Sequence, residues 1–228
     1  MQSYHHSPLS SETGREHQKT VAVIVAHPDD ETLWAGGTLL GHPEWDCFVV
    51  CLCRKSDAER SAKFYTALKE LSSNGTMGDL DDGPNQHPLP ESELENTILN
   101  LLPSSHYDLV LTHDLSGEYT RHLRHEEVSK AVIRLWQSGK IETDELWTFA
   151  YEDGLKAYYP RAIEKAPFYL QLADDIWTKK YQIITKTYGF NAGSWEAQTT
   201  PRTEAFWQFR NHSLAKDWLA HFGNRSNQ

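Results

Sequence analysis

The sequence Val21-Ala22-Val23-Ile24-Val25-Ala26-His27-Pro28-Asp29-Asp30-Glu31 decides the fold, because an apolar run ends abruptly in a cluster of polar groups. A short apolar run rich in β-branched residues is typical of a parallel strand buried on both faces. In open α/β sheets, ligands bind in the crevice beyond the carboxyl ends of the strands. An imidazole and carboxylates are costly to bury there unless they are paired or bind a metal ion. We therefore expect a catalytic metal site at this junction.

Strand-like and helix-like patterns alternate along the rest of the chain. Strands are expected at Thr20–Ala26, Trp45–Cys53, Tyr107–Thr112 and Glu145–Tyr151, with a short one around Gly75–Leu80. Helices are expected at Thr32–Leu40, from Ser56 or Asp57 to about Ser72, and at Glu91–Leu102, Arg124–Gln137, Pro167–Tyr188 and Thr203–Phe222. This order predicts βαβ units, and therefore an α/β fold with a mostly parallel sheet.

Length and composition indicate one domain. The 228 residues, 39% of them hydrophobic, suffice for one core but hardly for two. We expect a flexible tail at 1–18, a single domain at 19–228, and a helical continuation from about 152 to the end.

Charge and hydropathy indicate which classes of binding partner and which cellular location to expect. The net charge of −10 argues against a nucleic-acid or membrane-surface binder. No apolar run reaches the ~18 residues of a transmembrane helix. The polar start lacks the apolar centre of a secretory signal, which predicts a cytoplasmic protein. A small molecule is thus the expected partner, and a homo-oligomer stays open.

The three cysteines, Cys47, Cys51 and Cys53, fall at positions of one parity in an expected strand. Their side chains should then share one face of the sheet. A soft metal or redox cluster is one interpretation. Buried cysteines acting as small hydrophobic residues are the favoured one, because the sequence has no C-x-x-C pair.

The polar residues at two strand ends suit a catalytic metal centre. A catalytic zinc usually has three protein ligands and one open position. His27 and Asp30 offer two ligands, and either His122 or His125 can supply the third while the other faces the substrate. Asp29 would then be free to take a proton from the attacking water. A neighbouring histidine could stabilise the oxyanion.

Two motifs resemble those of the LmbE-like, or PIG-L, N-deacetylase family. Residues 26–31 read A-H-P-D-D-E, the first family signature, and residues 108–114 followed by Gly117-Glu118-Tyr119 and His122-x-x-His125 resemble the second. The resemblance implies a Rossmann-like fold with helices on both faces of the sheet. It also implies Zn²⁺, or another divalent transition metal, held by His27, Asp30 and His125. Asp29 matches the general base, and His122 matches the group that stabilises the oxyanion or protonates the amine.

The second motif departs from the family pattern, which usually reads G-x-H-P-D-H. Leu123-Arg124 replaces Pro-Asp, and Arg121 precedes it, so two cations are expected near the metal. The hypothesis is that the substrate carries a carboxylate or phosphate. Family members also carry an arginine after the second strand, and Arg54 is the candidate here.

Three further residues are assigned by position. Trp195, in a Gly-Ser-Trp loop, is expected to line the substrate cleft. His113 and Asp114 end a strand, and they either orient the metal and the imidazole or form a structural turn. By contrast, Asp82 is expected in a solvated turn, since its surroundings lack the spacing of a calcium loop.

The resemblance implies a hydrolase that removes an acetyl group from an N-acylated sugar derivative, by cleaving a linear amide bond. Two alternatives stay open. One is an amidase for a cyclic, nucleoside-derived or amino-acid-derived amide, and the other is a non-enzymatic protein of this fold that binds a metal or an anion. An unligated Asp29 favours an enzyme, because a binding protein has no need of a base there.

Overall fold

The computed structural model describes residues 18–223, and most of the expected N-terminal tail lies outside this range. A seven-stranded sheet runs through its centre in the order β3-β2-β1-β4-β5-β9-β8. Its strands are β1 (Thr20–Val25), β2 (Asp46–Cys53), β3 (Asn74–Leu80), β4 (His106–Thr112), β5 (Glu142–Phe149), β8 (Phe168–Gln171) and β9 (Thr203–Phe209). The first five are parallel, whereas β9 runs antiparallel to both β5 and β8. The expected mostly parallel sheet is confirmed.

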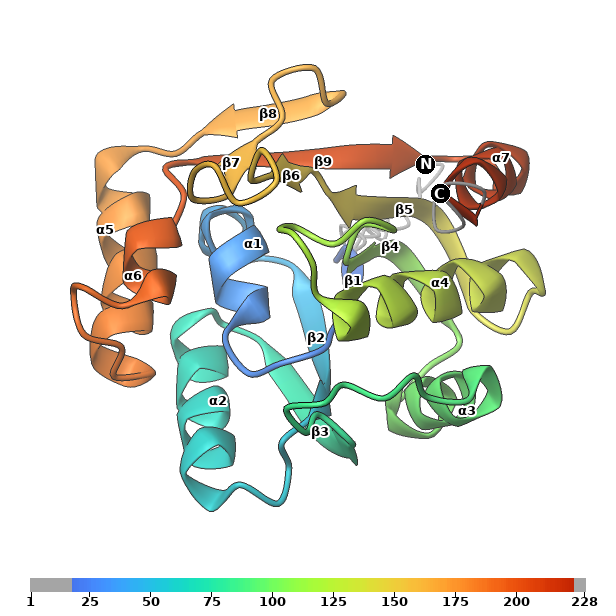
Figure 1. Ribbon diagram of the computed structural model, residues 1–228, viewed down its shortest axis with the longest axis horizontal. Helices are drawn as coiled ribbons and strands as arrows, with labels where there is room; N and C mark the ends of the chain where they lie inside the picture. Colours follow the sequence, from blue (N-terminus) through green and yellow to red (C-terminus); the bar gives the residue numbers. More distant parts are fainter. Residues whose placement is uncertain (1–17, 224–228) are drawn as a thin grey trace, which may run out of the picture.

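Helices cover both faces of this sheet (Figure 1). They are α1 (Asp30–Gly41), α2 (Ala58–Glu70), α3 (Glu91–Leu101), α4 (Leu123–Gln137), α5 (Asp174–Gln182), α6 (Trp195–Thr199) and α7 (His212–Gly223). A π-helical turn, Ile183–Thr187, continues α5, and a small hairpin pairs β6 (Tyr151–Glu152) with β7 (Arg161–Ala162). No helix among residues 18–223 is long and apolar enough to cross a membrane.

The central strand β1 is buried on both faces, as its sequence predicts. Val21, Val23 and Val25 pack in the cluster beneath α1, α2 and the π-helical turn, while Ala22 and Ile24 pack beneath α3 and α4. All five side chains are fully buried. Because both faces are apolar, the strand needs no polar alternation.

The C-terminal part is less helical than expected. The stretch predicted as a helix at Pro167–Tyr188 begins with β8, and the one predicted at Thr203–Phe222 begins with β9. The antiparallel pairing of β9 with β5 fixes this segment as a strand. This tertiary pairing overrides the local propensity on which the helix prediction depended.

The cysteines do not share one face. Cys47 and Cys51 pack on the side of α1 and α2, whereas Cys53 packs on the opposite side. The pairing of β2 with β3 also shifts its register between Cys51 and Cys53. All three are free and buried, consistent with small hydrophobic residues.

A buried ion pair fixes helix α1, which begins at Asp30 of the first motif. Glu204 on β9 accepts hydrogen bonds from the backbone amides of Gly37 and Thr38 and from the Thr38 hydroxyl, at 2.6–2.7 Å. Lys180 on α5 donates to the same carboxylate at 2.7 Å, and both charged side chains are fully buried. Each charge is thus satisfied, and α1 is tied to β9, the strand next to the edge of the sheet.

Candidate active site

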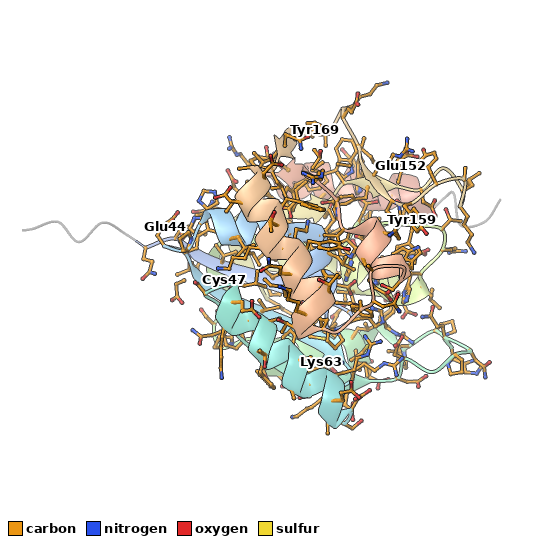
Figure 2. The ribbon with its side chains drawn as sticks, turned by 90° about the vertical axis from the view of Figure 1, so that its left-hand side faces the viewer. Glu44, Cys47, Lys63, Glu152, Tyr159 and Tyr169 are labelled. Carbon is orange, nitrogen blue, oxygen red and sulfur yellow. The ribbon has the colours of Figure 1, made fainter. Side chains whose placement is uncertain are left out.

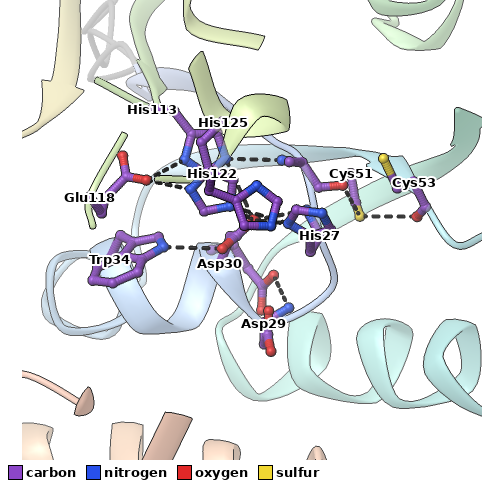
Figure 3. Close-up of polar contacts among 12 residues, drawn as sticks. His27, Asp29, Asp30, Trp34, Cys51, Cys53, His113, Glu118, His122 and His125 are labelled. Carbon is purple, nitrogen blue, oxygen red and sulfur yellow. Dashed lines mark hydrogen bonds and ion pairs between the residues drawn. The ribbon is translucent and has the colours of Figure 1, made fainter. Parts of the chain in front are cut away.

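The sheet topology brings the two motifs together. β1 and β4 are parallel neighbours, so their carboxyl ends lie at the same edge. His27 follows β1, and His113 follows β4, while His125 lies in the first turns of α4. Figure 3 shows these imidazoles gathered over the start of α1.

The three expected metal ligands bring one ligand atom each into a small triangle. Nδ1 of His27 lies 3.2 Å from Oδ2 of Asp30 and 3.2 Å from Nε2 of His125. The third side of this triangle, from Nε2 of His125 to Oδ2 of Asp30, is 3.4 Å. Tetrahedral zinc, with bonds of 2.0–2.1 Å, separates its ligand atoms by about 3.3 Å. The donor types and their spacing therefore fit a zinc ion.

Alternative sets of ligand atoms overlap with this triangle. His27 with His122 and His125, and Asp30 with His113 and His125, also bring three ligand atoms within 4.8 Å of one another. His125 belongs to every set. The centre is therefore rich in imidazole, and which groups bind an ion depends on where each ring carries its proton.

Each of the three converging side chains has a second partner that orients it. The indole of Trp34 donates to Oδ1 of Asp30 at 3.0 Å, which leaves Oδ2 toward the histidines. Oε2 of Glu118 accepts from Nδ1 of His125 at 2.6 Å. Such outer partners fix the tautomer of a ligating histidine and raise its basicity.

His27 has an equivalent partner. Oδ1 of Asp82 lies 3.0 Å from Nε2 of His27, at ion-pair distance although not aligned as a hydrogen bond. The carboxylate favours a proton on Nε2, so that Nδ1 keeps its lone pair toward Asp30. Asp82 is thus not in a solvated turn, because Arg54 pulls it toward the site through contacts of 2.6 and 3.0 Å.

His113 and Asp114 lie behind the converging side chains. Nε2 of His113 accepts from the amide of Ala26 at 3.0 Å and lies 3.5 Å from Oδ2 of Asp30. Its Nδ1 donates to Glu118 at 3.0 Å. Asp114 instead holds the following turn by accepting from Ser116, and burial raises its pKa to about 6.

Asp29 has an unusual backbone conformation. Its φ of 125° is rare for a residue with a side chain, and such strain is frequent at functional sites. The carboxylate is buried but lines the cavity described below, and its nearest cation is Arg60, at 3.9 Å. Burial and the charge of Asp30 raise the pKa of Asp29 well above its ordinary value.

His122 stands beside His27 and His125, with ring centroids 4.7 and 4.3 Å away. Its Nε2 contacts the side-chain amide of Gln86 at 3.2 Å. Burial, with the neighbouring His125 and His27, lowers the pKa of His122 to about 3. The imidazole is thus neutral near pH 7.

A cavity of about 440 Å³ opens over the site. It is lined by the converging His27 and Asp30, by Asp29 and His122, and by Arg54, Arg60, Asp82, Gln86, Tyr119, Trp195 and others. Trp195 and Arg54 both line this cavity. The guanidinium of Arg54 is hydrogen-bonded to Asp82, whereas that of Arg60 lies 3.9 Å from Asp29.

The expected pair of cations in the second motif does not line this cavity. Arg124 is fully buried, and its guanidinium pairs with Glu127 instead of facing a substrate. Arg121 is exposed, pairs with Glu126 at 2.7 Å, and lines a neighbouring cavity of about 550 Å³. Neither arginine faces the catalytic cavity, because each pairs with a carboxylate on α4.

Comparisons with known proteins agree with this geometry. The sequence profile described as "PIG-L: GlcNAc-PI de-N-acetylase" matches residues 22–136. A relative from Acanthamoeba polyphaga mimivirus, named uncharacterized protein L374, is 28% identical over 178 residues, which are 71% of this chain and 75% of that protein. Its name assigns no activity.

Two solved structures show the shared fold. N,N'-diacetylchitobiose deacetylase from Pyrococcus horikoshii has a TM-score of 0.63 at 16% identity, covering 85% of both chains. GalB, the 4-carboxy-2-hydroxymuconate hydratase of Pseudomonas putida KT2440, has a TM-score of 0.58 at 18% identity, covering 84% of this chain and 96% of its own. The two proteins are named for different reactions, so the fold alone does not decide the chemistry.

The family profile spans half of the chain and contains both motifs whose side chains converge in the site. This protein belongs to the PIG-L family.

Proposed function

We propose that the protein is a zinc-dependent N-deacetylase that hydrolyses the linear amide of an N-acetylated sugar derivative. The observation that carries this proposal is the triangle formed by Nδ1 of His27, Oδ2 of Asp30 and Nε2 of His125, with sides of 3.2–3.4 Å. These residues would hold the ion. When bound, zinc supplies a Lewis acid that polarises a carbonyl and activates water.

Asp29 is proposed as the general base. Its carboxylate lines the cavity, and its backbone has the unusual φ of 125°. A carboxylate held beside the attacking water can take its proton and later pass one to the leaving amine. The unusual φ of Asp29 is thus consistent with a catalytic role for this residue.

His122 is proposed to face the substrate carbonyl. A neutral imidazole stabilises an oxyanion by donating an N–H, and this requires no positive charge. The rings of His122 and Tyr119 pack edge to face, with centroids 5.6 Å apart, on one wall of the cavity. The donor is thus held in place before the reaction begins.

We further propose that the sugar carries an anionic group, bound in the neighbouring cavity of about 550 Å³. This cavity shares Tyr119 and Trp195 with the catalytic one, and adds the cations Arg121 and Lys156 and the rings of Tyr158 and Tyr159. Tyr159 lies at the surface on the loop after β6 (Figure 2). A third cavity, of about 500 Å³, lies beside Arg54. It is lined by four aspartates, which repel anions.

The test is acetate release by the zinc-loaded protein from N-acetylglucosamine and from N-acetylglucosamine 1-phosphate. We expect release from both, with a lower KM for the phosphate. Lys156→Met should reduce this preference roughly fivefold, as for the loss of one ionic contact. Lys69→Met, on the exposed face of α2, is the matched control. Absence of release from either compound contradicts the deacetylase proposal, and equal use of both contradicts the anionic substrate.

A further inference from the structure

The carboxylate of Asp29 does not cap the helix that it precedes. Asp29 is the N-cap residue of α1, and an aspartate at this position usually accepts a hydrogen bond from an amide of the first turn. Here the side chain makes no such bond, and it is the carbonyl of Asp29 that accepts from the amides of Thr32 and Leu33, at 3.0 and 2.8 Å. The φ of 125° thus accompanies a carboxylate that lines the catalytic cavity instead of the helix end.

A buried carboxylate binds the amide of Asp29. Oε2 of Glu31 accepts from this amide at 3.2 Å, and Glu31 is completely buried. A side-chain-bearing residue in such a conformation costs on the order of 1–3 kcal/mol, and it persists only where its surroundings hold it. The helix start holds the carbonyl of Asp29, and Glu31 holds its amide.

Two hydroxyls fix the other oxygen of Glu31. Oε1 accepts from Thr32 and from Tyr188, each at 2.6 Å. Tyr188 is 3% exposed, lies 157 positions further along the chain, and packs in the same core cluster as Val25 and Leu33. Glu31 therefore cannot turn away from Asp29 without losing both hydroxyl contacts.

The π-helical turn Ile183–Thr187 presents Tyr188 to this carboxylate. The amide of Tyr188 donates to the carbonyl of Ile183 at 2.9 Å, and Gly189, with a φ of 80°, ends the turn directly afterwards. Such wide turns are frequent at functional sites. The segment lies beyond residues 22–136, which the family profile matches, so that profile carries no information about it.

We propose that Glu31 and Tyr188 hold the backbone of Asp29 in the conformation that directs its carboxylate into the catalytic cavity. Both are positioning residues, since they act through Asp29. A displacement of about 1 Å at a reacting group can lower a rate about 100-fold. The inference rests on the proposed deacetylase function for its effect on the rate, whereas the contact with the Asp29 amide can be measured without metal or substrate.

Two replacements of Glu31 separate its geometry from its charge. In Glu31→Gln the side-chain oxygen can still accept from the Asp29 amide, and the nitrogen can donate to the two hydroxyls, which turn to accept. In Glu31→Met the side chain has a similar length, but its thioether is at most a weak acceptor. The glutamine variant should therefore keep the conformation of Asp29, and the methionine variant should lose it.

Hydrogen exchange of the metal-free protein reports the contact directly. In Glu31→Met the Asp29 amide should exchange at least about tenfold faster than in the wild type, because its acceptor is gone. The amides of Thr32 and Leu33, which donate to the Asp29 carbonyl, are the internal control and should stay protected. Glu31→Gln should match the wild type at all of these amides.

Acetate release by the zinc-loaded variants tests the consequence for the reaction. At equal zinc content, kcat of Glu31→Met should fall roughly 100-fold, as for a misplaced reacting group. Its KM should stay within about threefold of the wild-type value, since a loss confined to the transition state lowers kcat alone. Glu31→Gln should stay close to the wild type in both constants.

Tyr188→Phe keeps the proposal testable even if Glu31→Met does not fold. It removes one hydroxyl and leaves Glu31 with Thr32, so kcat should fall roughly tenfold, as for one hydrogen bond to a charged group. The Asp29 amide should again exchange faster. Tyr107→Phe is the matched control, because this buried tyrosine lies near the start of β4, at the end of the strand away from the site.

The outcomes separate this inference from the proposed function. Unchanged exchange of the Asp29 amide in both Glu31→Met and Tyr188→Phe, or an equal loss of kcat in Glu31→Gln and Glu31→Met, overturns the inference. Exchange that accelerates at Leu33 as much as at Asp29 also overturns it, since the whole start of α1 would then have loosened. If exchange follows the prediction but the wild type releases no acetate, the hold on Asp29 stands and the deacetylase proposal fails.

Discussion

Glu118 accepts a 2.6 Å hydrogen bond from Nδ1 of His125, on the side of the ring opposite to the atom that faces His27 and Asp30. The same oxygen, Oε2, accepts from His113 at 3.0 Å. Both histidines and the buried carboxylate are thus one hydrogen-bonded unit. Burial opposes the charge of Glu118, but the two imidazoles hold its pKa down at about 2.

Glu118→Gln should therefore weaken metal binding without abolishing folding. The amide preserves the size of the side chain but cannot accept both imidazole protons at one oxygen as strongly as a carboxylate. Loss of such a partner typically reduces metal affinity 10–100-fold. The measurement is zinc affinity by competition with a chelator. Glu196→Gln, in the wall of the catalytic cavity, is the control, and an equal zinc affinity in the two variants would contradict the role of Glu118.

Two adjacent glycines of α1 should respond differently to alanine. A Cβ at Gly37 would lie 2.4–2.5 Å from the methyl groups of Leu172 and 3.0 Å from Glu204, which is too close for either neighbour to stay where it is. At Gly36 the nearest atom, on Thr32, is 3.3 Å away. Gly37→Ala should cost about 1–3 kcal/mol through overpacking. Gly36→Ala should be near neutral, since it gains up to about 1 kcal/mol of helix propensity.

Urea unfolding of the two variants measures this difference in the free energy of unfolding. If Gly37→Ala is as stable as Gly36→Ala, the close packing of α1 against Leu172 and Glu204 is wrong.

The cysteines should be inert in the folded protein. Burial raises the pKa of Cys47 to about 12 and that of Cys51 well above its ordinary value. A raised pKa leaves the thiol protonated through pH 8–9, and the thiolate is the reactive form. Titration with a thiol reagent at pH 8 should detect none of the three cysteines before unfolding and all three in denaturant. Rapid reaction of any cysteine in the native protein would contradict the burial of β2.

Much of the fold and the residues that form the triangle of ligand atoms can be predicted from the sequence, because they depend on local patterns. The apolar run of β1 and the motif His27-Pro28-Asp29-Asp30 are contiguous, and the order of strands brings His125 to the same edge. By contrast, β9 is defined by pairing with β5, which lies more than fifty residues earlier. Local propensity carries no information about such a partner.

The groups missed around the site have the same cause. The Asp-Gly-Pro surroundings of Asp82 predict a solvated turn, yet its carboxylate contacts His27, 55 positions earlier. The charge of Arg124 indicates an anion-binding role when the sequence is considered alone. In the structure its guanidinium donates instead to the carbonyl of His87, 37 positions earlier. Glu118 had a usable signal, since it belongs to the second motif and a carboxylate commonly binds the far nitrogen of a ligating histidine.

The central claim is that Asp29 is the base of a zinc-dependent deacetylase whose metal is held by neighbouring side chains. Asp29→Asn keeps the size of the side chain and suits a positive φ better than most residues. The direct measurement is acetate release from N-acetylglucosamine 1-phosphate by zinc-loaded wild type and Asp29→Asn at equal zinc content. We predict release by the wild type and a rate at least about 100-fold lower in the variant. Equal rates in the two proteins would contradict the account.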